Sequence, residues 1–543
     1  MAAACQDGWQ RLLALAMLYR AFATVGGLTM VSRLLGFARD ILIAAALGSG
    51  AIADAFFVAF RFPNLFRRLF GEGAFNAAFV PLFARRLEGE GPEAARTFAE
   101  EALAGLAFVL AVFSVIAVLA MPWLMVVLAP GFLNDPVKFD LAVLLTQIAF
   151  PYLFCMSLVA LLSGVLNSLH RFWAAAAAPI LLNIVLISAI LLAIGLGYGQ
   201  RPEAGIVLAA GVFVAGLAQL AMLWIAVRRA GVKLSLRWPV YTPGVQRLVH
   251  LGIPGLISGG ITQINIVVGT IIASLQAGAV SHLYYADRLY QLPLGIVGVA
   301  IGVVLLPDLA RRLRAGEHAA AMDSQNRSLE FGLLITLPAA VALGVAAEPI
   351  VRVLFERGAF RPEDTPATAH ALAAFAIGLP GFVLIKVFQP GFFAREDTRT
   401  PMYFAVVNMA LNVAGSIGLF FLFREWGLMP HVGIALATTI AGWTNAALLW
   451  IALAEAGHFR WDARLARNLP LIALASAAMG GAIHVALPYL APYLSASAPL
   501  SVQFGTLVGL VAAGCALYAA MILGTGVMSL RQLRSYARRR PPG

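Results

Sequence analysis

The chain has 543 residues and a formal net charge of +12, and 61% of its residues are hydrophobic while only 12% are charged. Its mean hydropathy is +0.87, and a water-soluble protein of this length needs more polar surface than such a sequence provides. Composition therefore excludes a large soluble enzyme and predicts an all-α polytopic membrane protein.

Apolar runs bounded by charged residues, Pro or Gly predict about fourteen spanning helices along the chain. Their centres fall near residues 36, 66, 115, 153, 184, 216, 262, 294, 340, 381, 413, 443, 479 and 513. Fourteen spans with short connections use nearly the whole length, so no soluble domain of ordinary size fits between them. An even number of spans places both termini on the same side.

An internal repeat predicts how these spans are organised. The segment VPLFARRL at 80–87 recurs as LPDLARRL at 306–313. Six helices separate the two copies, so the repeats are parallel and form two six-helix lobes that face a central cavity. We expect an N-terminal leader at 1–20 without a clear cleavage site, an N-lobe at 21–230 and a C-lobe at 240–457. Two further helices follow at 465–528, and then a basic cytoplasmic tail at 529–543.

The basic residues of the loops predict the orientation. One set of loops carries 23 Lys and Arg residues, and the opposite set carries only six: Lys138, Arg201, Arg352, Arg357, Arg361 and Arg424. By the positive-inside rule, the richer side and both termini are cytoplasmic. This distribution also explains the net positive charge without any nucleic-acid partner.

Several ionisable residues fall inside the predicted spans. The cations are Arg33, Arg39, Arg61, Arg67, Arg68, Arg288 and Lys386, and the acids are Asp40, Asp54, Glu72 and Asp287. A charge at the bilayer centre costs about 2.5–3.5 kcal/mol on the most lenient scale, so such groups face a partner or a watery cavity. They are the candidate functional residues.

The spacing of these charges indicates a shared surface. Asp54, Arg61, Arg68 and Glu72 follow one another at intervals of seven, seven and four residues, which keeps them near one stripe of a helix. Pro63 lies among them, and Pro293 lies in the equivalent eighth span. We therefore expect both spans to bend or break beside the charges, as helices do at transport sites.

Pairing between neighbours is the main alternative for some of these charges. Arg39 with Asp40 or Asp54, and Arg288 with Asp287, could simply hold helices together. Pairing cannot account for the whole set, because seven cations and four acids leave an excess of three positive charges. An anionic ligand supplies the missing charge, and arginine matches the oxygens of phosphate or pyrophosphate.

The sequence lacks the motifs of ATP hydrolysis, of metal binding and of enzymatic catalysis. The three lysines follow Val, Val and Ile, so the Gly-Lys-Ser/Thr of a phosphate-binding loop is absent and we predict no ATPase. The cysteines (Cys5, Cys155, Cys515) are too far apart for a pair motif, and the histidines lack ligand spacing. We expect neither a metal site nor a cofactor, and no enzyme.

At these charged segments the sequence resembles the MurJ (MviN) family of bacterial lipid II flippases, within the multidrug/oligosaccharidyl-lipid/polysaccharide (MOP) exporter superfamily. The matching segments are SRLLGFARD at 32–40, ADAFFVAF at 53–60, PNLFRR at 63–68, EGAF at 72–75, YYADRL at 284–289, Lys386, PGF at 390–392 and TP at 400–401. The resemblance extends from about Met17 to the last span, and its first ninety residues are the most specific part.

The resemblance implies an inner-membrane protein that moves lipid II, the undecaprenyl-pyrophosphate-linked peptidoglycan precursor, to the periplasmic leaflet by alternating access for cell-wall synthesis. It implies cavity positions at Arg33, Arg39, Arg67 and Arg288, with Lys386 and Asp54 beside them. Together with Arg68 and Glu72 from the charged stripe, these are our candidate substrate-binding residues. The resemblance further implies a groove for the polyprenyl tail on the last two helices, and peptidoglycan polymerases are candidate partners.

Three alternatives follow from the same sequence. A flippase of another polyprenyl-pyrophosphate-linked oligosaccharide has a cargo of the same charge and stays open. An exporter of cationic drugs should line its cavity with acids, which is the opposite of the charges found here. A transporter-like scaffold should carry a cytoplasmic partner domain, for which the chain has no room.

Overall fold

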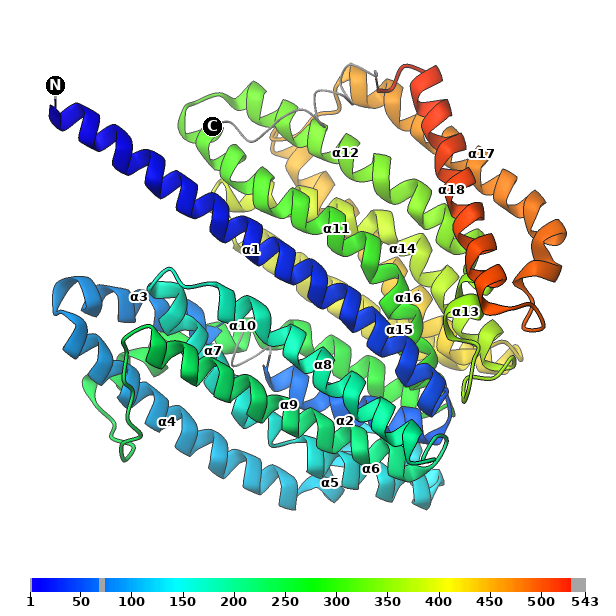
Figure 1. The fold of residues 1–543 in the computed structure, drawn as a ribbon. Coiled ribbons are helices and arrows are strands. Elements are labelled where there is room, and N and C mark those ends of the chain that lie inside the picture. The colour runs from blue at the N-terminus through cyan, green and yellow to red at the C-terminus, as the bar shows by residue number, and fades with distance from the viewer. Residues whose placement is uncertain (1, 68–73, 529–543) are drawn as a thin grey trace. The chain divides into compact units, whose positions relative to one another are not determined.

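The computed structural model describes residues 2–67 and 74–528, and this part of the chain contains helices and no strand (Figure 1). In chain order the helices are α1 (Ala2–Leu47), α2 (Ala51–Arg67), α3 (Ala74–Gly89), α4 (Pro92–Leu119), α5 (Met121–Leu128), the 3-10 helix η2 (Pro130–Asn134), α6 (Pro136–Ala149), α7 (Tyr152–Ser168), α8 (Trp173–Gly195), α9 (Pro202–Arg229), α10 (Pro243–Ser274), α11 (Ala279–Arg314), α12 (His318–Val345), α13 (Ala347–Phe355), α14 (Asp364–Phe393), α15 (Arg399–Glu425), α16 (Pro430–Glu455), α17 (Ala463–Leu494) and α18 (Leu500–Gly524).

Ten helical segments of the described chain are long and apolar enough to cross a membrane. They are α4, the pair α6 and α7 taken as one segment, α8, α9, α12, α14, α15, α16, α17 and α18. Each expected span centre lies in a helix, which confirms the all-α prediction. Helices satisfy their own backbone hydrogen bonds, and this is why long apolar runs adopt them in lipid.

Helix ends follow local sequence signals. The Thr242 hydroxyl accepts a hydrogen bond from the Val245 amide at 3.3 Å, and Pro243 starts α10. Asp462 caps α17 in the same way, through the Leu465 amide at 2.7 Å. Before α15, the amide of Thr400 donates to Asp397, and this hydrogen bond lowers the pKa of that carboxyl. These hydrogen bonds mark where α10, α15 and α17 begin.

The described chain divides into two compact units, residues 1–280 and 281–543. In unit 1, α8 packs against α1 and α9, α7 packs against α9, and α2 packs against α6. Small residues allow the close approaches: a Cβ atom at Gly211 in α9 would lie 2.9 Å from the Cβ of Ala189 in α8. Glycine at such contacts is how membrane helices pack without a hydrophobic driving force.

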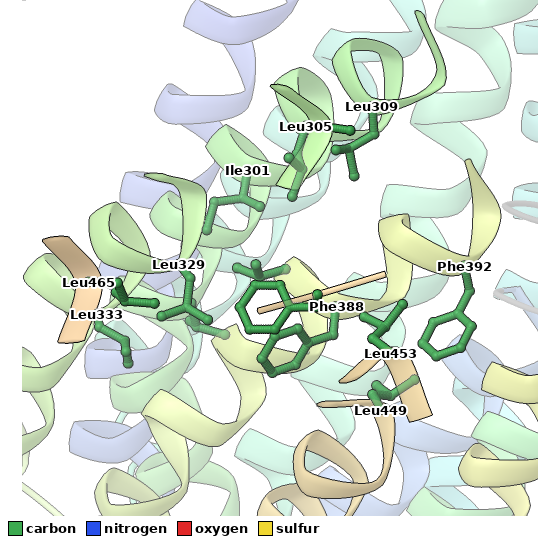
Figure 2. Packing of buried hydrophobic residues seen from close by; sticks show 14 of the residues in the cluster. Ile301, Leu305, Leu309, Leu329, Leu333, Phe388, Phe392, Leu449, Leu453 and Leu465 are labelled. Atoms are coloured by element: carbon green, nitrogen blue, oxygen red, sulfur yellow. The ribbon is translucent and has the colours of Figure 1, made fainter. Parts of the chain in front are cut away.

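In unit 2, α14 packs against α12 and α16, and α16 packs against α15. A buried cluster drawn from α11, α12, α14, α16 and α17 fills the space between them, and Figure 2 shows Phe388 among Leu329, Leu333 and Leu453. The pair α17 and α18 contact each other, and α17 lies along α12. The last two helices are therefore attached to this unit chiefly through α12.

Helix α10 packs with the N-terminal unit, although the sequence placed it at the start of the C-lobe. Its end is tied there by two contacts, because Arg61 Nη1 donates to Thr270 Oγ1 at 3.0 Å and the Gly131 amide donates to Ser274 Oγ at 3.1 Å. At its start, Thr242 donates to Glu101 Oε2 at 2.7 Å. The compact unit thus ends at residue 280, after this helix.

Proline does not break either charged helix at the expected position. Pro63 lies inside α2 and Pro293 inside α11, and both helices continue past it. Proline removes one backbone hydrogen bond, but helices in lipid tolerate it because neighbouring groups satisfy the remaining carbonyl. The chain therefore does not break at Pro63 or Pro293, while a bend at these prolines, the other form of the expectation, stays a prediction.

Candidate functional site

Arg39 on α1 is the first of the candidate charges, and it lies in a buried polar cluster. Its Nε and Nη2 atoms donate to Asp40 Oδ1 at 3.0 and 2.7 Å, and Nη1 donates to Asn183 Oδ1 on α8 at 3.0 Å. Asn183 in turn donates to the Ser32 carbonyl at 2.9 Å. Arg39 is 6% exposed and Asp40 is 2% exposed. The pairing alternative thus describes Arg39 in this structure, where it links α1 to α8.

Asp54 on α2 is fully buried and paired with a residue that the sequence placed in a loop. Lys138 Nζ on α6 lies 2.7 Å from Asp54 Oδ2, and the Gly278 amide donates to the same oxygen at 2.8 Å. The Lys138 ammonium also lies 4.1 Å from the centre of the Phe132 ring. Asp54 therefore contacts an ammonium, and with 0% exposure it has no surface to offer a ligand in this conformation.

Arg61 lies on α2, seven residues after Asp54, and its side chain is half-buried. Besides its hydrogen bond to Thr270 Oγ1, it borders a small cavity of about 30 Å³ between α2 and α10. A cavity of this volume holds a water molecule but no larger ligand. Arg61 consequently serves as a contact between two helices here.

Arg33 differs from Arg39 although both lie on α1. Among the side chains that the structure describes, none forms a hydrogen bond or ion pair with its guanidinium, and the Arg33 side chain is half-buried. An arginine with five unused donors at this depth in an apolar helix is expensive unless water or a ligand reaches it. Among the unit 1 candidates whose side chains are described, Arg33 is therefore the best placed to meet an anion.

Unit 2 holds the candidates Arg288 and Lys386. The Arg288 guanidinium lies 4.6 Å from the centre of the Tyr284 ring, one turn earlier on α11, while Asp287 accepts a hydrogen bond from Gln291. Lys386 on α14 is exposed, and a Cβ atom at Gly298 of α11 would lie 3.9 Å from its Cγ atom. Ten residues of helix place Gly298 about 15 Å along α11 from Arg288.

Three candidates on the second predicted span cannot be compared with the structure in this way. Arg68 and Glu72 lie outside the described residues, and Arg67 is described only as the last residue of α2. Their place in the site stays a prediction from the sequence.

The contacts change the charge count made from the sequence. Asp40 neutralises Arg39, as one alternative had it, but Asp54 neutralises Lys138, which the sequence had counted outside the spans. Spacing along the chain gives no signal for a partner 84 residues away. Asp54 is therefore paired with a cation outside the seven that were counted, and Arg33 and Lys386 have no acidic partner among the described side chains.

Two histidines that the sequence treated as structural lie together in unit 2. The rings of His282 and His431 are 5.4 Å apart, His282 Nδ1 lies 3.0 Å from Thr368 Oγ1, and His431 Nε2 donates to the Ala367 carbonyl at 2.9 Å. No group of three His, Cys, Asp or Glu side chains suited to a metal ion occurs in the described ranges. The pair joins the starts of α11, α14 and α16.

Comparison with known proteins gives a family for this fold. The family model described as lipid II flippase MurJ matches residues 43–502. A probable lipid II flippase MurJ of Rhizobium meliloti is 52% identical over 524 residues, covering 96% of each chain. The lipid II flippase MurJ of Burkholderia cenocepacia is 34% identical, covering 86% of this chain and 90% of its own length.

Solved structures agree with this assignment. A lipid II flippase MurJ in an inward closed conformation superposes with a TM-score of 0.76 at 25% identity, covering 92% of this chain and 98% of the other. An inward-facing multidrug resistance MATE transporter of the MOP superfamily has a TM-score of 0.61 at 16% identity, which shows a shared fold alone. By sequence match, coverage and fold, the chain belongs to the MurJ family of lipid II flippases.

Proposed function

We propose that this protein moves lipid II from the cytoplasmic to the periplasmic leaflet of the bacterial inner membrane by alternating access. The observation that carries the proposal is the unpaired guanidinium of Arg33 on an apolar helix, in a chain of this family. The lipid II headgroup carries a pyrophosphate and peptide carboxylates, so unaided crossing would place several charges and a disaccharide in hydrocarbon. Arginine donors in a watery cavity lower this barrier.

The proposed architecture has fourteen spans, with both termini cytoplasmic. Two six-helix lobes surround a cationic cavity, and α17 and α18 form a groove in which the polyprenyl tail stays in lipid. Arg33, Arg67, Arg68, Arg288 and Lys386 contribute positive charge to the cavity. Arg39, Asp54 and Glu72 complete the proposed set, Arg39 and Asp54 acting by holding helices in place. Peptidoglycan polymerases are the proposed recipients of the flipped precursor.

Binding of the pyrophosphate by Arg33 and Arg288 is the proposed central step. Guanidinium groups present planar pairs of donors that match two phosphate oxygens, whereas lysine offers a single point charge. Transport then requires that the lobes change their arrangement while the headgroup stays bound, and the membrane potential or a cation gradient supplies the energy. We expect no ATP hydrolysis by this chain.

Complementation of a conditional lipid II flippase mutant, combined with a leaflet-resolved assay of the precursor, tests this function. Arg33→Ala or Arg288→Ala should abolish growth and outer-leaflet precursor while the protein stays inserted, and the lysine variants should restore only part of the activity. Arg424→Ala is the matched control, because this exposed arginine lies at the end of α15 and outside the proposed cavity. Full growth of both alanine variants would contradict the proposed roles.

The same assay distinguishes lipid II from the remaining alternative cargo. If the protein carried another polyprenyl-pyrophosphate-linked oligosaccharide, the depletion strain would not regain growth, and peptidoglycan precursor would stay on the inner leaflet even when the protein is present in the membrane.

A further inference from the structure

Unit 1 contains a cavity of about 690 Å³ where the end of α3, the start of α4 and the first turns of α10 meet. Its polar lining includes Arg86, Arg247 and His250, and no acidic side chain contributes to it. Leu82, Val249 and Ile253 form an apolar part of the same wall. The cavity is therefore cationic and amphiphilic, and none of the candidate transport residues lines it.

Arg86 is positioned by packing rather than by an ion pair. Its guanidinium carbon lies 4.5 Å from the centre of the Phe98 ring on α4. A Cβ atom at Gly244 of α10 would lie 2.7 Å from Arg86 Nη2, so glycine here lets the guanidinium lie against this turn without moving aside. Within the described chain, no hydrogen bond or ion pair uses its donors. The guanidinium thus lies against an aromatic ring and is not neutralised by any described side chain.

Two acids on α4 near this region are paired with other groups. Glu100, fully buried on α4, accepts hydrogen bonds from the amide and hydroxyl of Ser235 and lies 2.6 Å from Arg237 Nε. Glu101 accepts a hydrogen bond from Thr242. These contacts fasten the loop between α9 and α10 to α4, and neither Glu100 nor Glu101 is paired with Arg86 or Arg247.

The same loop indicates that the cavity lies at a membrane surface. Leu236, Trp238 and Tyr241 are 73, 88 and 68% exposed, and they alternate with the basic residues Lys233 and Arg237. Large apolar side chains facing water are unfavourable, whereas tryptophan and tyrosine are enriched at the boundary between lipid and water. We expect a loop of this composition to lie among the headgroups, and Tyr241 of this loop lines the cavity.

We propose that this cavity binds the phosphodiester headgroup of an anionic phospholipid. Arg86 and Arg247 contact the phosphate, and an acyl chain lies over Leu82, Val249 and Ile253. Basic pockets between membrane helices on the positively charged side commonly hold such headgroups. The volume suits a ligand of drug-like size and not a disaccharide with a pentapeptide. This site is separate from the proposed transport cavity and does not depend on which cargo the protein carries.

The test uses full-length protein in a zwitterionic detergent, with phosphatidylglycerol as the probe and native mass spectrometry as the readout. Arg86→Gln combined with Arg247→Gln should raise the apparent dissociation constant about 30-fold, since each arginine near a lipid surface contributes about five-fold. Arg228→Gln combined with Arg229→Gln removes the same charge from exposed positions at the end of α9 and should change the constant less than about two-fold.

A single substitution controls for the possibility that the double variant misfolds. Arg247 is exposed on α10, so Arg247→Gln should leave the fold intact and still weaken binding about five-fold. Equal weakening in the cavity and control variants would reduce the effect to general surface charge and overturn the proposal. Displacement of the lipid by millimolar inorganic phosphate would also overturn it, because the site would then belong to a soluble anion.

Discussion

Arg33 and Arg39 lie six residues apart on one helix, yet their side chains have opposite surroundings. Arg39 is buried against Asp40 and Asn183, whereas no contact neutralises Arg33 in the described chain. A buried pair contributes little net stability, but loss of one partner leaves an uncompensated charge. Substitutions at Arg39 should therefore act through folding, and substitutions at Arg33 through binding.

The Asp54–Lys138 pair gives a prediction for stability at the residue scale. Lys138→Met should destabilise the protein by about 3–5 kcal/mol, because the Asp54 carboxylate then stays buried without its cation. The midpoint of thermal unfolding of the purified protein, followed by size-exclusion chromatography, reports this loss.

A double variant supplies the control for that experiment. Combining Lys138→Met with Asp54→Asn should restore most of the midpoint, since asparagine carries no charge and still offers an acceptor to the Gly278 amide. A double variant as unstable as the sum of both single variants would show that the two residues do not interact.

Residue spacing revealed some of these contacts and could not reveal others. Arg39 and Asp40 are adjacent, so the sequence already contained their pairing as an alternative. No such signal exists for Lys138. It lies two residues after Pro136 at the start of α6, and the sequence therefore indicates a loop residue at this position. Only the packing of α6 against α2 brings its ammonium to Asp54.

At the scale of elements, Gly433 allows a close approach between α15 and α16. A Cβ atom at Gly433 would lie 2.7 Å from the backbone carbonyl of Leu419. Gly433→Ala should force the helices apart and lower stability by about 1–3 kcal/mol. Gly418→Ala on α15 is the control, because nothing lies within 4 Å of its Cβ position. It should be neutral or stabilising by about 0.5–1 kcal/mol. Thermal midpoints of both variants, measured side by side, test the contrast.

Glu330 joins α12 to α17. Its oxygens accept hydrogen bonds from Asn468 at 2.7 Å and Arg464 at 3.3 Å, and it also pairs with Arg327. Glu330→Ala should speed hydrogen exchange in the first turns of α17, because a buried amide and two arginines lose their partner. Asp323→Ala removes a mostly exposed acid near Arg327 and should leave exchange in α17 unchanged. Equal exchange in both variants would contradict a specific role for Glu330.

The sequence predicted the helices well because a long apolar run has one stable form in lipid. It predicted their interruptions less well. The proline rule comes mainly from helices in water, and α2 and α11 continue through Pro63 and Pro293. The grouping of α10 with the N-terminal unit was also invisible, since it rests on side-chain contacts such as that of Arg61 with Thr270.

At the scale of the whole molecule, the proposed orientation can be tested directly. In a variant without the native Cys5, Cys155 and Cys515, a membrane-impermeant maleimide should label Ala496→Cys in intact cells, because the loop between α17 and α18 is expected to be periplasmic. Leu236→Cys, in the loop between α9 and α10, should react only after the cells are permeabilised. Labelling of Leu236→Cys in intact cells would reverse the assigned topology.

The burial of Asp54 and Lys138 restricts how the sequence can change over evolutionary time. Loss of either charge alone leaves the other buried without this ion pair, so we expect an intermediate with one substitution to be selected against. The two positions should therefore vary together among descendants of this gene, and a homologue with a neutral residue at one position should have a neutral residue at the other.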